Sequence, residues 1–136
     1  MTKTGFYSGQ FRQSEAIEGK KPMQRMFTQT IYLGPALAAN HTVIFKAPVD
    51  MQLVRVSAVN TTANAGKLDI GSSADDDAYL DNQDFGVSST PVEYAQSAFV
   101  GGQYPHIPAG TAVKISITDH ASHMAGVTVL LSFTEG

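Results

Sequence analysis

The chain has 136 residues with 9 Lys+Arg against 12 Asp+Glu, 15% charged residues, and neither cysteine nor tryptophan. A chain of this length normally folds as one domain around one hydrophobic core. The lack of cysteine excludes disulfide scaffolds, thiolate metal sites and cysteine nucleophiles. No run of about 18 apolar residues occurs, and no apolar segment follows the first lysines, so the sequence predicts neither a membrane span nor a secretory signal. A net charge of −3 gives no whole-chain reason to expect nucleic acid as a partner.

The charge is divided unevenly along the chain. Residues 1–27 contain five Lys+Arg against two Glu, a net charge of +3, whereas residues 28–136 contain four Lys+Arg against ten Asp+Glu, a net charge of −6. Opposite charge on two parts of one small protein indicates that the basic segment contacts its own acidic body, a sister subunit or a larger acidic surface. A disordered, solvated tail is the alternative.

Large apolar side chains are scattered through this basic segment among Gly, Ser, Gln and Lys. A tail that only has to stay solvated carries few aromatic residues, and no helical or alternating period connects these side chains. We therefore interpret residues 1–27 as an extended arm that becomes ordered on a partner surface. The candidate contact residues of the arm are Phe6, Tyr7, Phe11, Arg12, Arg25, Met26 and Phe27.

From residue 28 onward the sequence has the pattern of β-strands, with β-branched and aromatic residues between turns rich in Gly, Pro and Asn. Predicted strands cover residues 28–33, 42–47, 51–59, 67–71, 93–99, 112–118 and 126–134. Strand 51–59 is partly apolar on both alternating faces, which predicts burial between two layers. No segment after residue 28 keeps a helical period for three turns.

Seven or eight short strands with 12 glycines and 6 prolines predict an all-β fold. The expected architecture is an antiparallel β-sandwich, jelly-roll-like, with an extended N-terminal arm; a closed barrel is the alternative. The predicted organisation is an arm over residues 1–27 and a β-sandwich domain over residues 28–136.

The segment 75–84 contains five of the ten acidic residues of the body, and carboxylate oxygens are the ligands that Ca²⁺ prefers. The EF-hand pattern fails, because a frame starting at Asp75 places Leu80 where glycine is required and Gly86 where the bidentate glutamate belongs. An irregular calcium site is one interpretation. We prefer an acidic loop that faces solvent or another subunit and complements the basic arm.

His120 and His123 lie beside Asp119, and His106 precedes them by one predicted strand. Imidazole clusters can hold zinc, but without cysteine such a site would need His106 or a carboxylate to complete it. The stronger interpretation is structural: Asp119 and the two nearby histidines hydrogen-bond the backbone of a tight turn between the last two strands.

The sequence contains no G-x-S-x-G or Ser-x-x-Lys motif, and Gly101-Gly102 is not followed by the helix that a phosphate-binding loop requires. We therefore expect no enzyme, no catalytic residue and no cofactor. Sugar binding is harder to dismiss, because jelly rolls host many lectins. In the absence of tryptophan, Tyr79, Tyr94 and Tyr104 would have to form the binding platform.

Five segments of the body form a recognisable set: residues 45–59, residues 66–80, residues 105–111, Asp119-His-Ala-Ser-His-Met and the terminal Leu131-Ser-Phe-Thr-Glu-Gly136. Together they resemble the small β-sandwich head proteins of tailed bacteriophages, the decoration or cement proteins of the capsid exterior. The resemblance covers about residues 42–136 and does not include the arm.

This resemblance implies a structural virion protein that binds the outer surface of the phage head and stabilises contacts between major capsid subunits. The implied partners are the major capsid protein and further copies of the chain, as a homo-oligomer (dimer or trimer), with no direct nucleic acid and no membrane. The chain would be made in the host cytoplasm. A carbohydrate- or receptor-binding module of a phage tail or fibre is the alternative.

Overall fold

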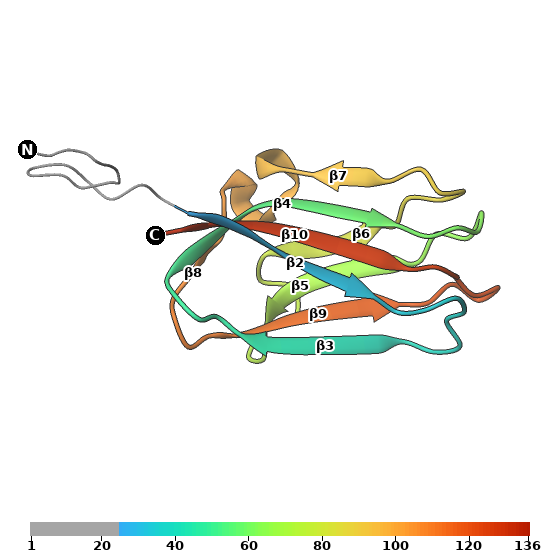
Figure 1. Cartoon of the computed structure of the whole chain (residues 1–136), viewed down its shortest axis with the longest axis horizontal. Helices are drawn as coiled ribbons and strands as arrows, with labels where there is room; N and C mark the ends of the chain where they lie inside the picture. The colour runs from blue at the N-terminus through green and yellow to red at the C-terminus, as the bar shows by residue number, and fades with distance from the viewer. Residues whose placement is uncertain (1–24) are drawn as a thin grey trace, which may run out of the picture.

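The strands of residues 25–136, the part of the chain that the computed structural model describes, form two antiparallel sheets packed face to face (Figure 1). The first sheet has the order β2-β10-β4-β7, with β8 also paired to β4, and the second has the order β3-β9-β5-β6. The strands of the first sheet are β2 (Met26–Tyr32), β4 (Met51–Val59), β7 (Val92–Tyr94), β8 (His106–Ile107) and β10 (Thr128–Glu135). Those of the second are β3 (His41–Lys46), β5 (Lys67–Ser72), β6 (Leu80–Asp84) and β9 (Ala112–Thr118).

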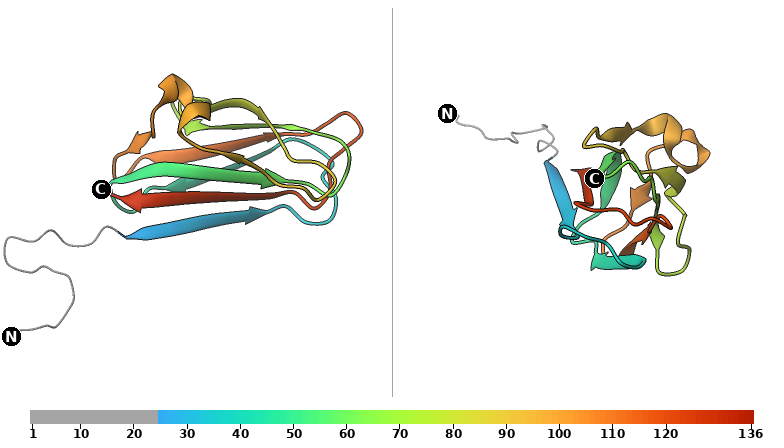
Figure 2. Two further views of the ribbon diagram at one scale, coloured as in Figure 1. Left: turned by 90° about the horizontal axis from the view of Figure 1, so that it is seen from above. Right: turned by 90° about the vertical axis from the view of Figure 1, so that its right-hand side faces the viewer.

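The strand order is that of a jelly roll. The chain crosses from one sheet to the other after β2, β3 and β4, runs through β5 and β6 as neighbours, and returns through β9 to β10, which lies beside the first strand β2. Eight principal strands in two sheets with these crossovers make the jelly-roll sandwich, and the views in Figure 2 show the two layers with the connecting loops at their ends. The predicted antiparallel sandwich is confirmed, whereas the predicted extended arm lies outside the described residues up to residue 24. The closed-barrel alternative is wrong, because each sheet ends in separate edge strands.

The core lies between the two sheets and consists of the inward side chains of every long strand. Its largest fully buried members include Phe133, Met51, Leu53, Leu68, Ile70, Ile115, Ile117 and Leu131. Among the described residues, the short helices η1 (Gln96–Ala98) and η2 (Val100–Gly102) follow β7. No helix in this part of the chain is long and apolar enough to span a membrane.

Strand β4 corrects one sequence prediction. Its apolar pattern does not reflect two buried faces: a bulge against β10 shifts the register between Leu53 and Arg55. A bulge adds one residue to a strand and so reverses which alternating positions face inward. Met51 and Leu53 are buried before the bulge, and Val56 and Ala58 are buried after it. The strand is central in its sheet but has one core face.

Other segments also differ from the predicted elements. Residues 80–84, expected to belong to an acidic loop, form the edge strand β6, in which only Leu80 is buried. Asp and Asn are rare in strands, so composition concealed it. The predicted strand 93–99 is instead the three-residue β7 followed by η1. Strand β2 begins at Met26, two residues earlier than expected.

Candidate functional site

A hollow of about 290 Å³ lies where the described part of the chain begins, between the start of β2, the loop after β3 and the end of β10. It is lined by Arg25, Met26, Phe27, Pro48, Val49 and Glu135. The start of β2 and the C-terminus lie at the same end of the sandwich (Figure 1). The hollow therefore marks the place where the N-terminal segment joins the body.

Arg25 contacts the last strand, β10, through both its side chain and its backbone. Its guanidinium donates to the Glu135 carboxylate through Nε at 3.1 Å and Nη2 at 2.8 Å, and its carbonyl accepts from the Glu135 N–H at 2.8 Å. Hydrogen bonding from Arg25 lowers the pKa of Glu135 below its ordinary value, and the same contact raises the pKa of Arg25. A forked pair of this kind fixes geometry, so the direction in which the chain enters β2 is set here.

Met26 and Phe27 point to opposite sides of β2 and have different surroundings. Phe27 is half-buried and stacks on the core residue Phe133, with ring centroids 5.4 Å apart, so it belongs to the body. Met26 is 68% exposed. Four of the predicted arm contacts, Phe6, Tyr7, Phe11 and Arg12, lie outside the described residues.

The loop part of the acidic segment, which carries Asp75, Asp76 and Asp77, lies at the same end of the sandwich as the hollow, whereas β6 carries Asp84 to the opposite end. Ser72, at the end of β5, is opposite Val113 of β9, and Val113 is in turn opposite Phe45 of β3. The Phe45 ring contacts Phe133 edge-on at 6.1 Å, next to Phe27. The loop that follows Ser72 thus places its carboxylates at the end from which the basic arm departs. The pairing of arm and acidic loop remains a prediction.

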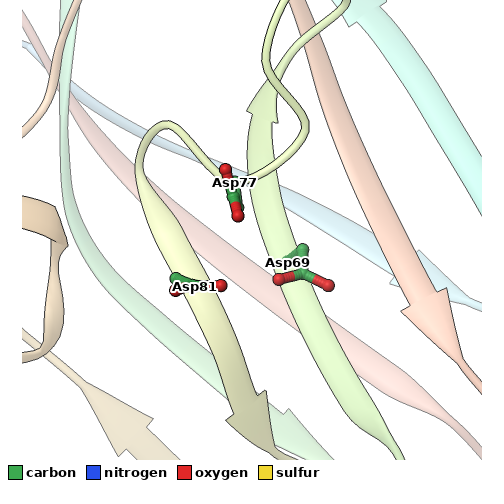
Figure 3. Close-up of side chains that lie close together, drawn as sticks. All are labelled: Asp69, Asp77 and Asp81. Carbon is green, nitrogen blue, oxygen red and sulfur yellow. The ribbon is translucent and has the colours of Figure 1, made fainter.

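Two carboxylates of the acidic segment are paired with lysines of the body, and others are crowded together. Lys67 pairs with Asp84, and Lys114 Nζ lies 2.8 Å from Asp76. Asp69 of β5, Asp77 of the loop and Asp81 of β6 bring oxygens within 4.8 Å of one another (Figure 3).

This crowding of carboxylates changes the pKa of Asp77. A hydrogen bond with Asp75, then burial and the charges of Asp75 and Asp81, raise the pKa of Asp77. Asp69 also has a structural role, since it accepts the N–H of Asn82 at 2.7 Å, where β6 bends through a positive φ of 53°. Sequence reasoning considered the carboxylates of the loop but missed Asp69, which is 12 residues away from Asp81. The calcium interpretation remains a prediction.

In the turn between β9 and β10, Asp119 and His120 hydrogen-bond the backbone as the structural interpretation predicts, whereas the His123 side chain contacts the Asp119 carboxylate instead. The Asp119 carboxylate accepts the N–H groups of His120 and Met124 at 2.9 and 2.8 Å and lies 2.7 Å from His123 Nδ1. The Ser122 N–H donates to His120 Nδ1 at 2.9 Å. His106 pairs with Gln52 at the other end of β4, so it cannot share an ion with the two turn histidines.

Asp119 should make the stability of the fold dependent on pH. Burial alone would raise its pKa, but the hydrogen bonds from His123, Met124 and His120 outweigh burial and lower it. A lowered pKa in the folded state stabilises the fold above the ordinary Asp pKa of about 4, and this stabilisation is lost as the pH falls through the lowered value. Asp119→Asn should therefore reduce the urea midpoint at pH 7, and the difference from wild type should shrink toward pH 2. An equal difference at both pH values would contradict this role.

The three tyrosines considered for sugar binding do not form one exposed platform. Tyr79 packs against the core, and the Tyr94 hydroxyl donates to the Asp84 carbonyl at 2.5 Å. Tyr104 is 41% exposed and lies beside Phe99, with ring centroids 6.3 Å apart.

Strand order, sheet packing and crossovers place the chain in the class of jelly-roll β-sandwiches. No family model matches the sequence, and no curated protein matches it significantly. Among solved structures it is similar to a chain of the "Cyanophage Pam1 capsid asymmetric unit", with a TM-score of 0.57 and 15% identity over 100% of both chains. At this identity the likeness shows a common fold.

Proposed function

We propose that this chain is a structural protein of a bacteriophage virion, a decoration or cement protein that binds the outer surface of the head and stabilises contacts between major capsid subunits. The observation that carries the proposal is the full-length jelly-roll likeness to a chain of a cyanophage capsid unit. The resemblance of residues 42–136 to phage head proteins, found from sequence alone, points to the same class.

The physical task of a cement protein matches the parts of this chain. It adds contact area across boundaries between capsid subunits, which requires a stable body, copies of itself and an adhesive extension, but no catalytic residue. Repeated identical capsid surfaces favour symmetric oligomers. An extended segment can lie over a neighbouring subunit and use backbone hydrogen bonds for affinity and aromatic side chains for register.

The root of the arm supports this proposal. The Arg25–Glu135 pair fixes the entry into β2, while the exposed Met26 and the apolar walls of Pro48 and Val49 leave a hollow beside that root. A capsid segment bound at the start of β2 would contact this hollow. Arg25 and Met26 then belong to the capsid contact, and Phe27 anchors the arm to the core through Phe133.

Deleting residues 2–24 should leave a folded body that no longer binds phage heads. The deletion ends before Arg25 because β2 begins at Met26 and pairs with β10 along its whole length. Circular dichroism should retain the β signal, and co-sedimentation with heads assembled without this protein should show binding of the full chain only.

Two further variants sharpen the experiment. A full chain with Phe6, Tyr7 and Phe11 changed to Ser keeps the arm charge and should also lose binding, whereas Tyr104→Ala, an exposed aromatic on the body, should bind like wild type. Undiminished binding by the deletion variant would remove the arm from the proposal. Failure of the full chain to bind heads would overturn the proposed function itself.

A further inference from the structure

The two sides of the sandwich end in strands of very different character. On one side lie β2 and β3, of seven and six residues. Strand β2 contains no Asp, Glu, Lys or Arg, and β3 contains none before its last residue, Lys46. Met26, Tyr32 and Ile44 on these strands are 68%, 62% and 56% exposed. Within residues 25–136, no strand pairs with the outer edge of β2.

The other side carries the features by which proteins protect an open edge. Strand β7 has only three residues and carries Glu93, which pairs with Arg55 at 2.5 Å. Strand β6 carries Asp81 and Asp84 and bends at Asn82. Short length, charge and irregular backbone discourage pairing with another chain. Strand β2 is neither short, charged nor irregular, which indicates an edge that can pair with another strand.

We propose that β2 pairs antiparallel with β2 of a second copy of this chain, about a two-fold axis at Gln29. This pairing deepens the proposed capsid role, on which it rests, by naming the surface that joins two copies. Met26 would lie opposite Tyr32 of the other copy and Thr28 opposite Thr30, so that the two first sheets become one continuous sheet.

The composition of β2 favours a second copy over another occupant. An edge without charge offers nothing to select a charged partner segment and fits another long uncharged strand, and β2 itself is such a strand. The pairing about Gln29 keeps the alternation of side chains, because the four outward residues Met26, Thr28, Thr30 and Tyr32, all exposed, oppose one another. A surface that is complementary to itself in this way is what a two-fold interface requires.

The absence of cysteine allows a direct test of register in the full-length protein. Gln29→Cys would face its own copy across the axis, at the roughly 5 Å Cβ separation of opposed residues, close to that of a disulfide. Under mild oxidation it should give a covalent dimer. Met26→Cys should not, because its two copies would be six residues apart along the strand, about 20 Å. Gln83→Cys, on the opposite edge strand β6, should also remain monomeric.

A second pair of variants tests the dimer without oxidation. Thr28→Lys/Thr30→Lys charges the exposed edge and should shift the protein from dimer to monomer in sedimentation velocity, while Gln83→Lys adds charge to β6 and should leave the dimer intact. The inference would be overturned if the wild-type protein were monomeric or if Gln29→Cys and Met26→Cys cross-linked equally. It would also be overturned if residues 1–24 covered the edge of β2. Heads are not needed here, so loss of head binding by an intact dimer would count against the proposed function alone.

Discussion

Replacing Phe133 by alanine is expected to lower the free energy of unfolding by about 3–5 kcal/mol, the usual cost of truncating a buried phenylalanine. Phe133 is fully buried, stacks on Phe27 of β2 and meets Phe45 of β3 edge-on. One ring thus joins both sheets at the end where the N-terminal segment enters. The loss is large for a domain whose total stability is of the order of 5–15 kcal/mol.

Urea unfolding followed by circular dichroism measures this loss. Phe133→Leu is the matched control, because it keeps most of the apolar volume and should cost clearly less than the alanine variant. In hydrogen exchange, the amides of β2 should lose protection before those of β9, since Phe27 loses its stacking partner whereas β9 remains paired on both sides. A loss below about 1 kcal/mol would contradict the central position of this ring.

The fold was predictable where the alternation of apolar residues is regular. Strand β9 (Ala112–Thr118) has the predicted bounds, because its inward and outward positions differ in polarity. Strand β4 (Met51–Val59) also has the predicted bounds, but its alternation is interrupted. The bulge in β4 was not predictable, since an extra residue reverses the alternation and imitates a strand with two apolar faces. Strand β6 was hidden by its Asp and Asn content, which edge positions tolerate.

The candidate sites were predictable only where the chemistry is local in sequence. The turn held by Asp119 involves residues within five positions, so Asp and His between two strands were sufficient signal. The hollow at the root of the arm joins Arg25, Val49 and Glu135, which only the pairing of β2 with β10 and the β3–β4 connection bring together. The edge character of β2 likewise depends on sheet order, which no local pattern contains.

Asn60 has a structural role that the sequence did not reveal. It is fully buried and is the only buried polar residue among residues 25–136. Its Nδ2 donates to the carbonyls of Asn64 and Gly86 at 3.0 and 2.9 Å, and its Oδ1 accepts from the N–H and hydroxyl of Thr62 at 2.9 and 2.5 Å. The side chain therefore joins the loop after β4 to the chain around Gly86.

Asn60→Ala should lower the free energy of unfolding by about 3 kcal/mol, because it leaves buried polar groups of the loop without partners. Gln52→Ala removes an exposed amide from the preceding strand, β4, and should stay within about 0.5 kcal/mol of wild type. The urea midpoint should fall for Asn60→Ala with an unchanged slope.

Asn60→Asp tests the two N–H donors of the side chain separately. It keeps the acceptor for Thr62 but loses both N–H bonds and buries a charge. Its loss of unfolding free energy should therefore be at least as large as that of Asn60→Ala at pH 7 and smaller at pH 4. Equal stability of Asn60→Ala and Gln52→Ala would mean that the loop closes without its buried amide.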